Sequence, residues 1–265
     1  MLWLALDKVG DNPVMTRVFL TAAVLPMVLW SQEAKPLELT AEEILEKSIE
    51  ASGGRAAREK IVSSVLKGEM EMGAQAMRGT IEIYSKAPNK RLTITRIEGL
   101  GEVRQGFDGK TGWRKDPSGN VSDITGPQLA LLEREATMNG ELNWRQLYEK
   151  VEVAGKGKVE NRETWVLQIT PKAGLPMVRY YDAETFLLLR SDITVTGGAK
   201  EFALKTFYAD YRNVEGVMVP FQITQQMPMG AIGTRITEVR YNVPLDDSLF
   251  SKPEPAPAPP APASK

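Results

Sequence analysis

The feature that most constrains the fold of this chain is an alternation of apolar and polar side chains with a period of two residues. It is clearest in residues 77–84, 165–170 and 217–226, and it returns in shorter segments between turns rich in Gly and Pro. Because successive side chains of a strand point to opposite faces, this period predicts half-buried β-strands. About ten or eleven such strands are predicted, and turns such as Asp108-Gly109 indicate antiparallel hairpins.

Other segments carry the longer period of amphipathic helices. Thr40-Ala41-Glu42-Glu43 is a capping box, and apolar residues follow it at helical spacing as far as Gly53-Gly54. In the middle of the chain, residues 126–136 and 144–148 predict two more short helices, separated by Asn139-Gly140. A sheet of this many strands must curve or split, and these helices are the only cover for one of its faces.

We therefore predict a mainly β fold with helices (α+β). The expected architecture is a strongly curved antiparallel sheet, or incomplete β-barrel, covered by an N-terminal helix and a mid-chain helical lid. The space between the sheet and the helices is expected to be either a packed core or a ligand cavity.

The two ends of the chain differ in composition from the rest. Residues 18–30 are apolar and uncharged and follow a basic residue, which is typical of a secretory signal peptide, although a buried helix is the other interpretation. We assign residues 1–31 to this signal region, with Met15 as an alternative start. Residues 252–265 are rich in Pro and Ala and predict a disordered tail, so residues 34–251 are expected to form one β-rich binding domain.

The sequence contains no cysteine and no histidine. This excludes disulfides, thiolate nucleophiles, catalytic triads that use His, and metal sites built on Cys or His. Chemistry based on paired carboxylates or lysine stays open, but no such pair is recognisable, so we expect a protein that is not an enzyme and has no catalytic residue, metal or cofactor. The net charge of -1 and the lack of clustered basic residues give no sign of nucleic-acid binding.

Two motifs resemble a known family. Residues 79–90 end in the turn Lys86-Ala87-Pro88-Asn89-Lys90, and residues 106–113 read Gly-Phe-Asp-Gly-Lys-Thr-Gly-Trp. Together they resemble the K-x-P-N turn and the DGK-x-x-W hairpin of the periplasmic lipoprotein-carrier (LolA/LolB-like) superfamily, within a layout that spans residues 41–250. Carriers of this family have an Arg directly before the turn proline, which latches the lid, whereas this chain has Ala87. We do not transfer the latch role to the nearby Arg91.

The resemblance implies an incomplete β-barrel whose helical lid closes over an apolar cavity, in a periplasmic protein that carries lipoprotein acyl chains. Relatives with this fold instead sense lipids or mislocalised proteins and regulate an anti-sigma factor. We therefore predict a periplasmic binding protein for lipid or lipoprotein acyl chains, of the outer-membrane lipoprotein sorting type. The alternative is a lipid-sensing or scaffolding envelope module that regulates a membrane partner. We expect a monomer, with a membrane-associated donor or acceptor protein as a partner in a carrier cycle.

Burying an acyl chain releases about 0.8 kcal/mol per CH₂, so such a function needs apolar side chains and no reactive group. Methionines suit an adaptable cavity, although each one could equally fill a core. The candidate cavity residues are Met72, Met77, Ile81, Ile83, Leu92, Ile94, Trp113, Leu129, Leu132, Trp144, Leu147, Trp165, Leu167 and Phe221.

Some charged and aromatic residues have their own interpretations. Residues 133–135, Glu-Arg-Glu, predict the solvated face of a helix, and Asp246-Asp247 predicts a solvated turn. Asp108 is expected to be a structural hairpin residue. Trp144, on the second mid-chain helix, is the best candidate for a contact between the lid and a ligand.

Overall fold

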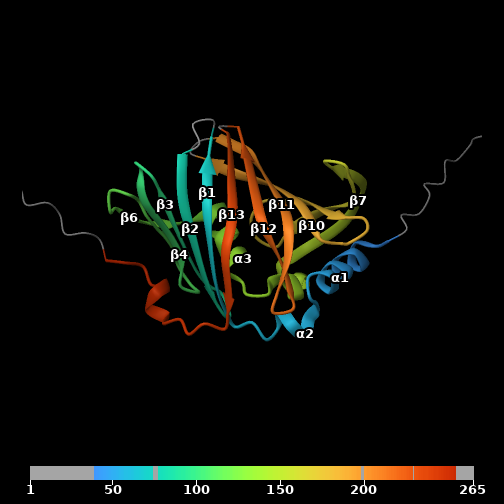
Figure 1. Ribbon diagram of the computed structural model, residues 1–265, viewed down its shortest axis with the longest axis horizontal. Coiled ribbons are helices and arrows are strands. Elements are labelled where there is room, and N and C mark those ends of the chain that lie inside the picture. Colours follow the sequence, from blue (N-terminus) through green and yellow to red (C-terminus); the bar gives the residue numbers. More distant parts are fainter. Residues whose placement is uncertain (1–38, 74–76, 198–199, 229, 255–265) are drawn as a thin grey trace, which may run out of the picture. The chain divides into compact units, whose positions relative to one another are not determined.

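The computed structural model describes residues 39–73, 77–197, 200–228 and 230–254. Their strands form one continuous antiparallel sheet of thirteen strands, accompanied by a few short helices (Figure 1). The predicted signal region, residues 1–31, lies outside the described residues, as does the tail from residue 255 onward. The mainly β fold with a curved, unclosed sheet is confirmed.

Helices precede, interrupt and follow the sheet. They are α1 (Ala41–Ala51), α2 (Gly54–Arg58), α3 (Gly126–Ala136), the 3₁₀ turn η1 (Gly140–Asn143), α4 (Trp144–Leu147) and the 3₁₀ turn η2 (Asp247–Phe250). The strands of the first half are β1 (Ser63–Met72), β2 (Met77–Lys86), β3 (Lys90–Ile97), β4 (Gly101–Phe107), β5 (Gly112–Lys115) and β6 (Val121–Ile124). Those of the second half are β7 (Tyr148–Val159), β8 (Arg162–Pro171), β9 (Met177–Asp182), β10 (Leu188–Gly197), β11 (Lys200–Val214), β12 (Val217–Met227) and β13 (Gly230–Tyr241).

The sheet consists of two meanders joined at its centre. Its strand order is β6-β5-β4-β3-β2-β1-β13-β12-β11-β10-β9-β8-β7, so the pairing of β1 with β13 connects the halves and leaves β6 and β7 as the edges. The segment α3–η1–α4 runs from one edge strand to the other. It crosses the concave face, where α3 contacts β3, β4 and β5 from one half and β10 from the other (Figure 1).

Thirteen strands rather than ten or eleven is a correction, and the difference comes from β1 and β6. The period of β1 is broken by a register shift between Lys67 and Gly68, and its sequence contains three charged residues. β6 is only four residues long, which is too short to show a period. Pairing with neighbouring strands, rather than the local pattern, makes both segments strands.

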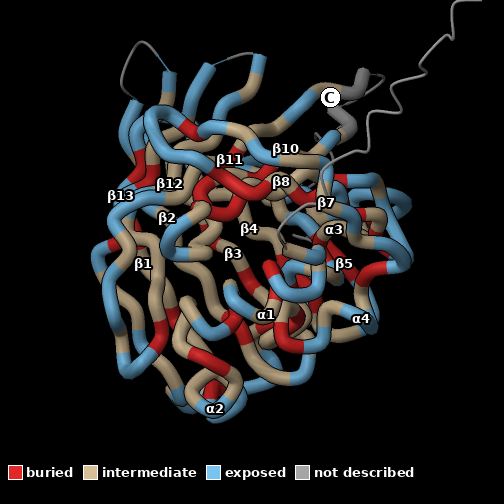
Figure 2. Tube along the Cα trace, turned by 90° about the vertical axis from the view of Figure 1, so that its right-hand side faces the viewer, coloured by how far each residue is buried: buried red, intermediate tan, exposed pale blue. Residues whose placement is uncertain are grey.

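Two solid regions of core lie on the concave face. At one end, Ile44 and Leu45 of α1 pack on Trp165, Leu167 and Ile169 of β8. The capping box at Thr40 begins α1 as predicted, and Figure 2 shows buried positions on β8 and around α1. At the other end, α3 packs on β4 and β6 through a buried cluster of Phe107, Ile124, Leu132 and Ala136.

The convex face is covered by the C-terminal segment. Phe250, which is fully buried, packs against Leu92, Ile94 and Trp113, and its carbonyl oxygen accepts a hydrogen bond of 2.9 Å from the indole Nε1 of Trp113. A Cβ at Gly106 would lie 2.3 Å from the Trp113 ring, so only glycine fits beside this indole. The Trp113 hairpin motif therefore serves to anchor the C-terminal segment.

The lysines of the K-x-P-N turn hold the same segment. The carboxylate of Asp247 accepts ion pairs from Lys86 at 2.7 Å and from Lys90 at 2.8 Å. Asp246 caps η2 by accepting a hydrogen bond from the backbone N–H of Ser248. The two aspartates are exposed, as a solvated turn predicts, but Asp247 also fastens the segment to the sheet.

Replacing Phe250 with Ala is expected to lower the free energy of unfolding by about 3–5 kcal/mol, because it leaves a cavity under Trp113. Urea unfolding followed by Trp fluorescence would measure the loss. The matched control is Leu100→Ala, since this side chain is 56% exposed and its removal should change the free energy by less than about 0.5 kcal/mol. Equal effects of the two substitutions would contradict the packing role of Phe250.

Candidate functional site: a cavity with an aliphatic and a charged wall

Between the two solid regions, the concave face encloses a cavity of about 660 Å³. The central strands of the sheet supply most of its aliphatic wall, from β1, β2, β11, β12 and β13. These side chains are Leu66, Ile81, Ile83, Leu204, Ile223 and Ile236, with Thr and Gln side chains among them. The volume lies within the range of about 300–1,000 Å³ that is common for small-molecule sites.

The cavity lining also carries charged side chains, which together we call its charged wall. Four arginines line the cavity: Arg58 at the end of α2, Arg91 on β3, Arg134 on α3 and Arg179 on β9. Among the described residues that line the cavity, only Glu135 and Glu141 carry a carboxylate. The cavity is therefore amphipathic and carries a positive charge, which is a correction to the purely apolar interior that the sequence predicts.

Glu141 binds two of the four arginines. Its carboxylate lies 3.2 Å from the guanidinium of Arg58 and 3.3 Å from that of Arg179. Burial raises the pKa of the Glu141 carboxyl, but the charges of the two arginines outweigh this effect and hold the pKa below its usual value. Arg179 also donates to the hydroxyl of Tyr181 and lies 5.8 Å from the ring centre of Tyr148.

Hydrogen bonds fix the mid-chain segment over the cavity. The left-handed backbone of Asn139 lets its side-chain amide donate to the carbonyl of Arg58 at 2.7 Å. Arg55 donates to the carbonyl of Leu142 at 2.7 Å. The N–H of Met138 donates to the carbonyl of Pro88 at 2.9 Å, so the K-x-P-N turn also holds the lid.

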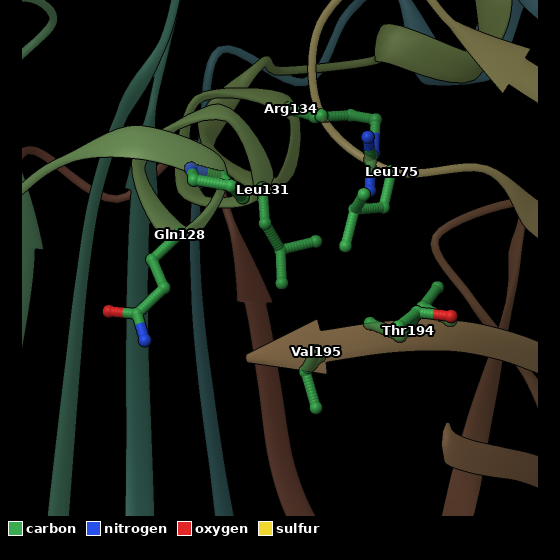
Figure 3. Close-up of a pocket in the computed structure, with 9 residues that line it drawn as sticks. Gln128, Leu131, Arg134, Leu175, Thr194 and Val195 are labelled. Carbon is green, nitrogen blue, oxygen red and sulfur yellow. The ribbon is translucent and has the colours of Figure 1, made fainter. Parts of the chain in front are cut away.

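A notch of about 30 Å³ adjoins the cavity between α3 and β10 (Figure 3). Leu131 and Arg134 reach it from the helix, Leu175 from the loop between β8 and β9, and Thr194 and Val195 from β10. A further hollow of about 290 Å³ lies on the other side of α3. Arg134 lines the cavity, the notch and this hollow, so its guanidinium lies where the three meet.

The structure places four of the predicted residues in the cavity wall. Ile81 and Ile83 lie on β2, Leu132 is on α3 and Leu147 ends α4. Whether these side chains contact a ligand stays a prediction.

Leu92, Ile94 and Trp113 do not line the cavity, contrary to the prediction. They face the convex side, where Phe250 covers them. The cause is the period of two, because Arg91 and Thr93, which alternate with Leu92 and Ile94 along β3, are on the face that lines the cavity.

The remaining predicted residues are also outside the cavity wall. Trp165 and Leu167 are in the solid core under α1, and Leu129 packs against the cluster under α3. Trp144 packs against α1 and donates to Glu46 rather than facing the cavity. Phe221 lies under the guanidinium of Arg212, and Met72 and Met77 pair at the end of the β1–β2 hairpin.

Sequence reasoning missed the charged wall. Arg134 was expected on the solvated face of a helix, but it points into the cavity. Its spacing of three residues from Leu131, which also lines the cavity, is the signal that could have revealed it.

Arg91 shares a face with Thr93 and lies 3.9 Å from Glu135 of α3, so it does connect the sheet to the lid. Met177 lines the cavity, although it was not a candidate.

The described residues contain no cluster of three or more side chains that could hold a metal ion. Among the helices of the described ranges, we find none with the length and apolar character needed to cross a membrane.

No protein-family model matches the sequence, and no curated protein matches it. Solved structures do match. A LolA superfamily protein from Nitrosomonas europaea has a TM-score of 0.55 at 14% identity, covering 81% of this chain and 98% of its own. A DUF1329 family protein from Desulfovibrio piger has a TM-score of 0.55 at 15% identity, and the match covers 80% of this chain and 97% of that protein. A domain from Vibrio parahaemolyticus named for outer membrane lipoprotein sorting has a TM-score of 0.56 at 16% identity, and the match covers 80% of this chain and 97% of that domain.

These neighbours define the class of the fold. The chain has a LolA-like fold, as its turn motifs predict. At such identities the likeness concerns the fold, and it does not carry over the function of any of these proteins.

Replacing Glu141 with Gln is expected to lower the free energy of unfolding at pH 7 by about 1–2 kcal/mol, less than for a fully buried pair because this side chain is 45% exposed. Since the folded pKa is lowered, the stabilisation by the carboxylate is complete above the ordinary value of 4.5 and is lost as the pH falls below it. Urea unfolding at a series of pH values would therefore show the wild type and the variant converging in acid.

The control for this experiment is Glu135→Gln, which removes a neighbouring cavity carboxylate whose ion pair with Arg91 is longer, at 3.9 Å. This substitution should lower the free energy of unfolding by less than Glu141→Gln does. A difference between wild type and Glu141→Gln that stays constant from pH 7 into the acid range would contradict the pairing.

Proposed function

We propose that this protein is a binding protein that holds lipid or lipoprotein acyl chains in the cavity between its curved sheet and its mid-chain helical segment. The observation that carries the proposal is the cavity of about 660 Å³ with an aliphatic wall formed by the central strands. A packed core would have filled this space, because protein interiors are normally as dense as organic crystals.

The physical basis is the transfer of methylene groups out of water. Each buried CH₂ contributes about 0.8 kcal/mol, so a long chain bound along the aliphatic wall offsets the cost of ordering it. The alternation of each strand supplies that wall, since Ile81 and Ile83 of β2 point inward together. The mid-chain segment α3–η1–α4 is the cover that separates the bound acyl chain from solvent.

The LolA-like fold and the solved domain named for lipoprotein sorting support a role in the cell envelope. We propose that the protein is exported to the periplasm, with residues 1–31 as the signal region, and acts there without catalysis. Exchange of the ligand with a membrane-associated donor or acceptor protein is part of the same proposal.

The test is direct binding of a neutral lipid, a long-chain monoacylglycerol, to the purified protein. Wild type is expected to bind it, and mass spectrometry of extracts from freshly purified protein is expected to show fatty acid or phospholipid. The double variant Ile83→Trp, Ile223→Trp should fill the cavity and lower the affinity about tenfold or more, because the aliphatic wall is then occupied.

The matched control is Ile97→Trp, which adds an indole on β3 away from the cavity. It should leave binding unchanged, and circular dichroism should show that all variants keep the sheet. Failure of a folded wild type to bind any acyl-chain lipid, or equal binding of monoacylglycerol by the cavity-filling variant, would contradict the proposed function.

A further inference from the structure

The charged wall of the cavity is unexpected for a protein that binds acyl chains alone. Burying a guanidinium without partners costs free energy, so a purely apolar ligand would leave such a wall poorly satisfied. Three buried guanidinium N–H groups on this wall have no hydrogen-bond partner within the described ranges: Nε of Arg91, Nη1 of Arg134 and Nε of Arg179. All three side chains line the same cavity.

Of these three arginines, Arg134 is the one without an ion pair in the described part of the chain. Arg91 lies 3.9 Å from Glu135, and Arg179 shares Glu141 with Arg58. Within the described part of the chain, no carboxylate lies at ion-pair distance from Arg134. Four arginines face two glutamates around the cavity, and a ligand with a negative charge would balance this excess.

The surroundings of Arg134 hold its guanidinium in place. Gly174, with a positive φ of 91°, lets the loop between β8 and β9 approach until a Cβ there would lie 3.5 Å from Nη1. Leu175 of the same loop lies beside the guanidinium (Figure 3). Burial lowers the pKa of Arg134, and the charge of nearby Arg179 adds to this effect. The side chain nevertheless stays charged, because a guanidinium group is not deprotonated in proteins.

The position of Arg134 suits the polar end of an amphiphile. Its guanidinium lies where the cavity meets the notch beside β10 and the hollow beside Lys172, whereas the aliphatic wall lies on the central strands. A ligand that enters with its chains against Ile83 and Ile223 would leave its head near Arg134 and Arg179. Guanidinium groups bind carboxylates and phosphates through charge-assisted hydrogen bonds, which are stronger than neutral ones.

We propose that the ligand of this cavity is an anionic amphiphile, whose carboxylate or phosphate is bound by Arg134 with the help of Arg179 while its acyl chain lies on the aliphatic wall. This inference rests on the proposed function and adds the chemical class of the head group. Arg134 then acts as a specificity residue, which separates acidic lipids from neutral ones.

The experiment compares three probes with the full-length protein at one low ionic strength. They are a lysophosphatidic acid, a monoacylglycerol with the same acyl chain, and inorganic phosphate. Wild type is expected to bind the lysophosphatidic acid at least about tenfold more tightly than the monoacylglycerol, and inorganic phosphate should bind far more weakly than both.

Arg134→Gln should remove the preference, lowering the affinity for lysophosphatidic acid about tenfold while changing that for monoacylglycerol less than about twofold. The control is Arg145→Gln, on α4 of the same helical segment, which removes a 55% exposed arginine outside the cavity. It should leave the affinities for both lipids unchanged, which separates a local head-group contact from a general loss of positive charge.

Each outcome decides the question. Equal binding of the two lipids by wild type, or an unchanged preference in Arg134→Gln, would overturn the anionic head group and leave acyl-chain binding intact. Phosphate binding as tight as that of lysophosphatidic acid would show a site for a free anion and overturn the amphiphile. Failure of both lipids to bind would overturn the proposed function itself, and the inference with it.

Discussion

The rest of the structure depends on one constraint: the chain has to connect the two unpaired edges of a single curved sheet. β6 and β7 lie at opposite edges, and residues between them cannot pass through the sheet, so they cross its concave face. The helix α3 accordingly contacts strands of both halves. Because the helical segment rests on solid core at each end and crosses open space between, the concave face holds a cavity rather than a filled interior.

The two faces of the sheet use the same alternation for different purposes. On the convex face, Trp113 and its neighbours bind the C-terminal segment through Phe250, and the lysines of the K-x-P-N turn fasten Asp247. On the concave face, isoleucines line the cavity, and arginines from α2, β3, α3 and β9 add positive charge. The turn at Lys86–Lys90 and the Trp113 hairpin thus hold the framework together, and the residues that line the cavity lie outside these two turns.

The candidate site could be predicted from the sequence only in part. Ile81 and Ile83, which lie on a strand with a regular period, are among the residues of the cavity wall. Leu92, Ile94 and Trp113 were misplaced, since a period of two separates two faces without saying which one is concave. The charged wall was missed because Arg58, Arg91, Arg134 and Arg179 lie on separate elements, so their proximity is a long-range property of the fold.

The sequence by itself determined the local structure: α1 begins at its capping box, α3 and α4 fall where the helical period predicts them, and most strands follow from alternation. It also excluded chemistry that needs Cys or His, because those residues are absent. The tertiary structure alone decided which face of each strand lines the cavity, that β1 and β6 are strands, and that four arginines meet two glutamates across one space. The physical reason is that periodicity is a property of neighbours along the chain, whereas curvature, register and charge balance depend on contacts between residues far apart in sequence.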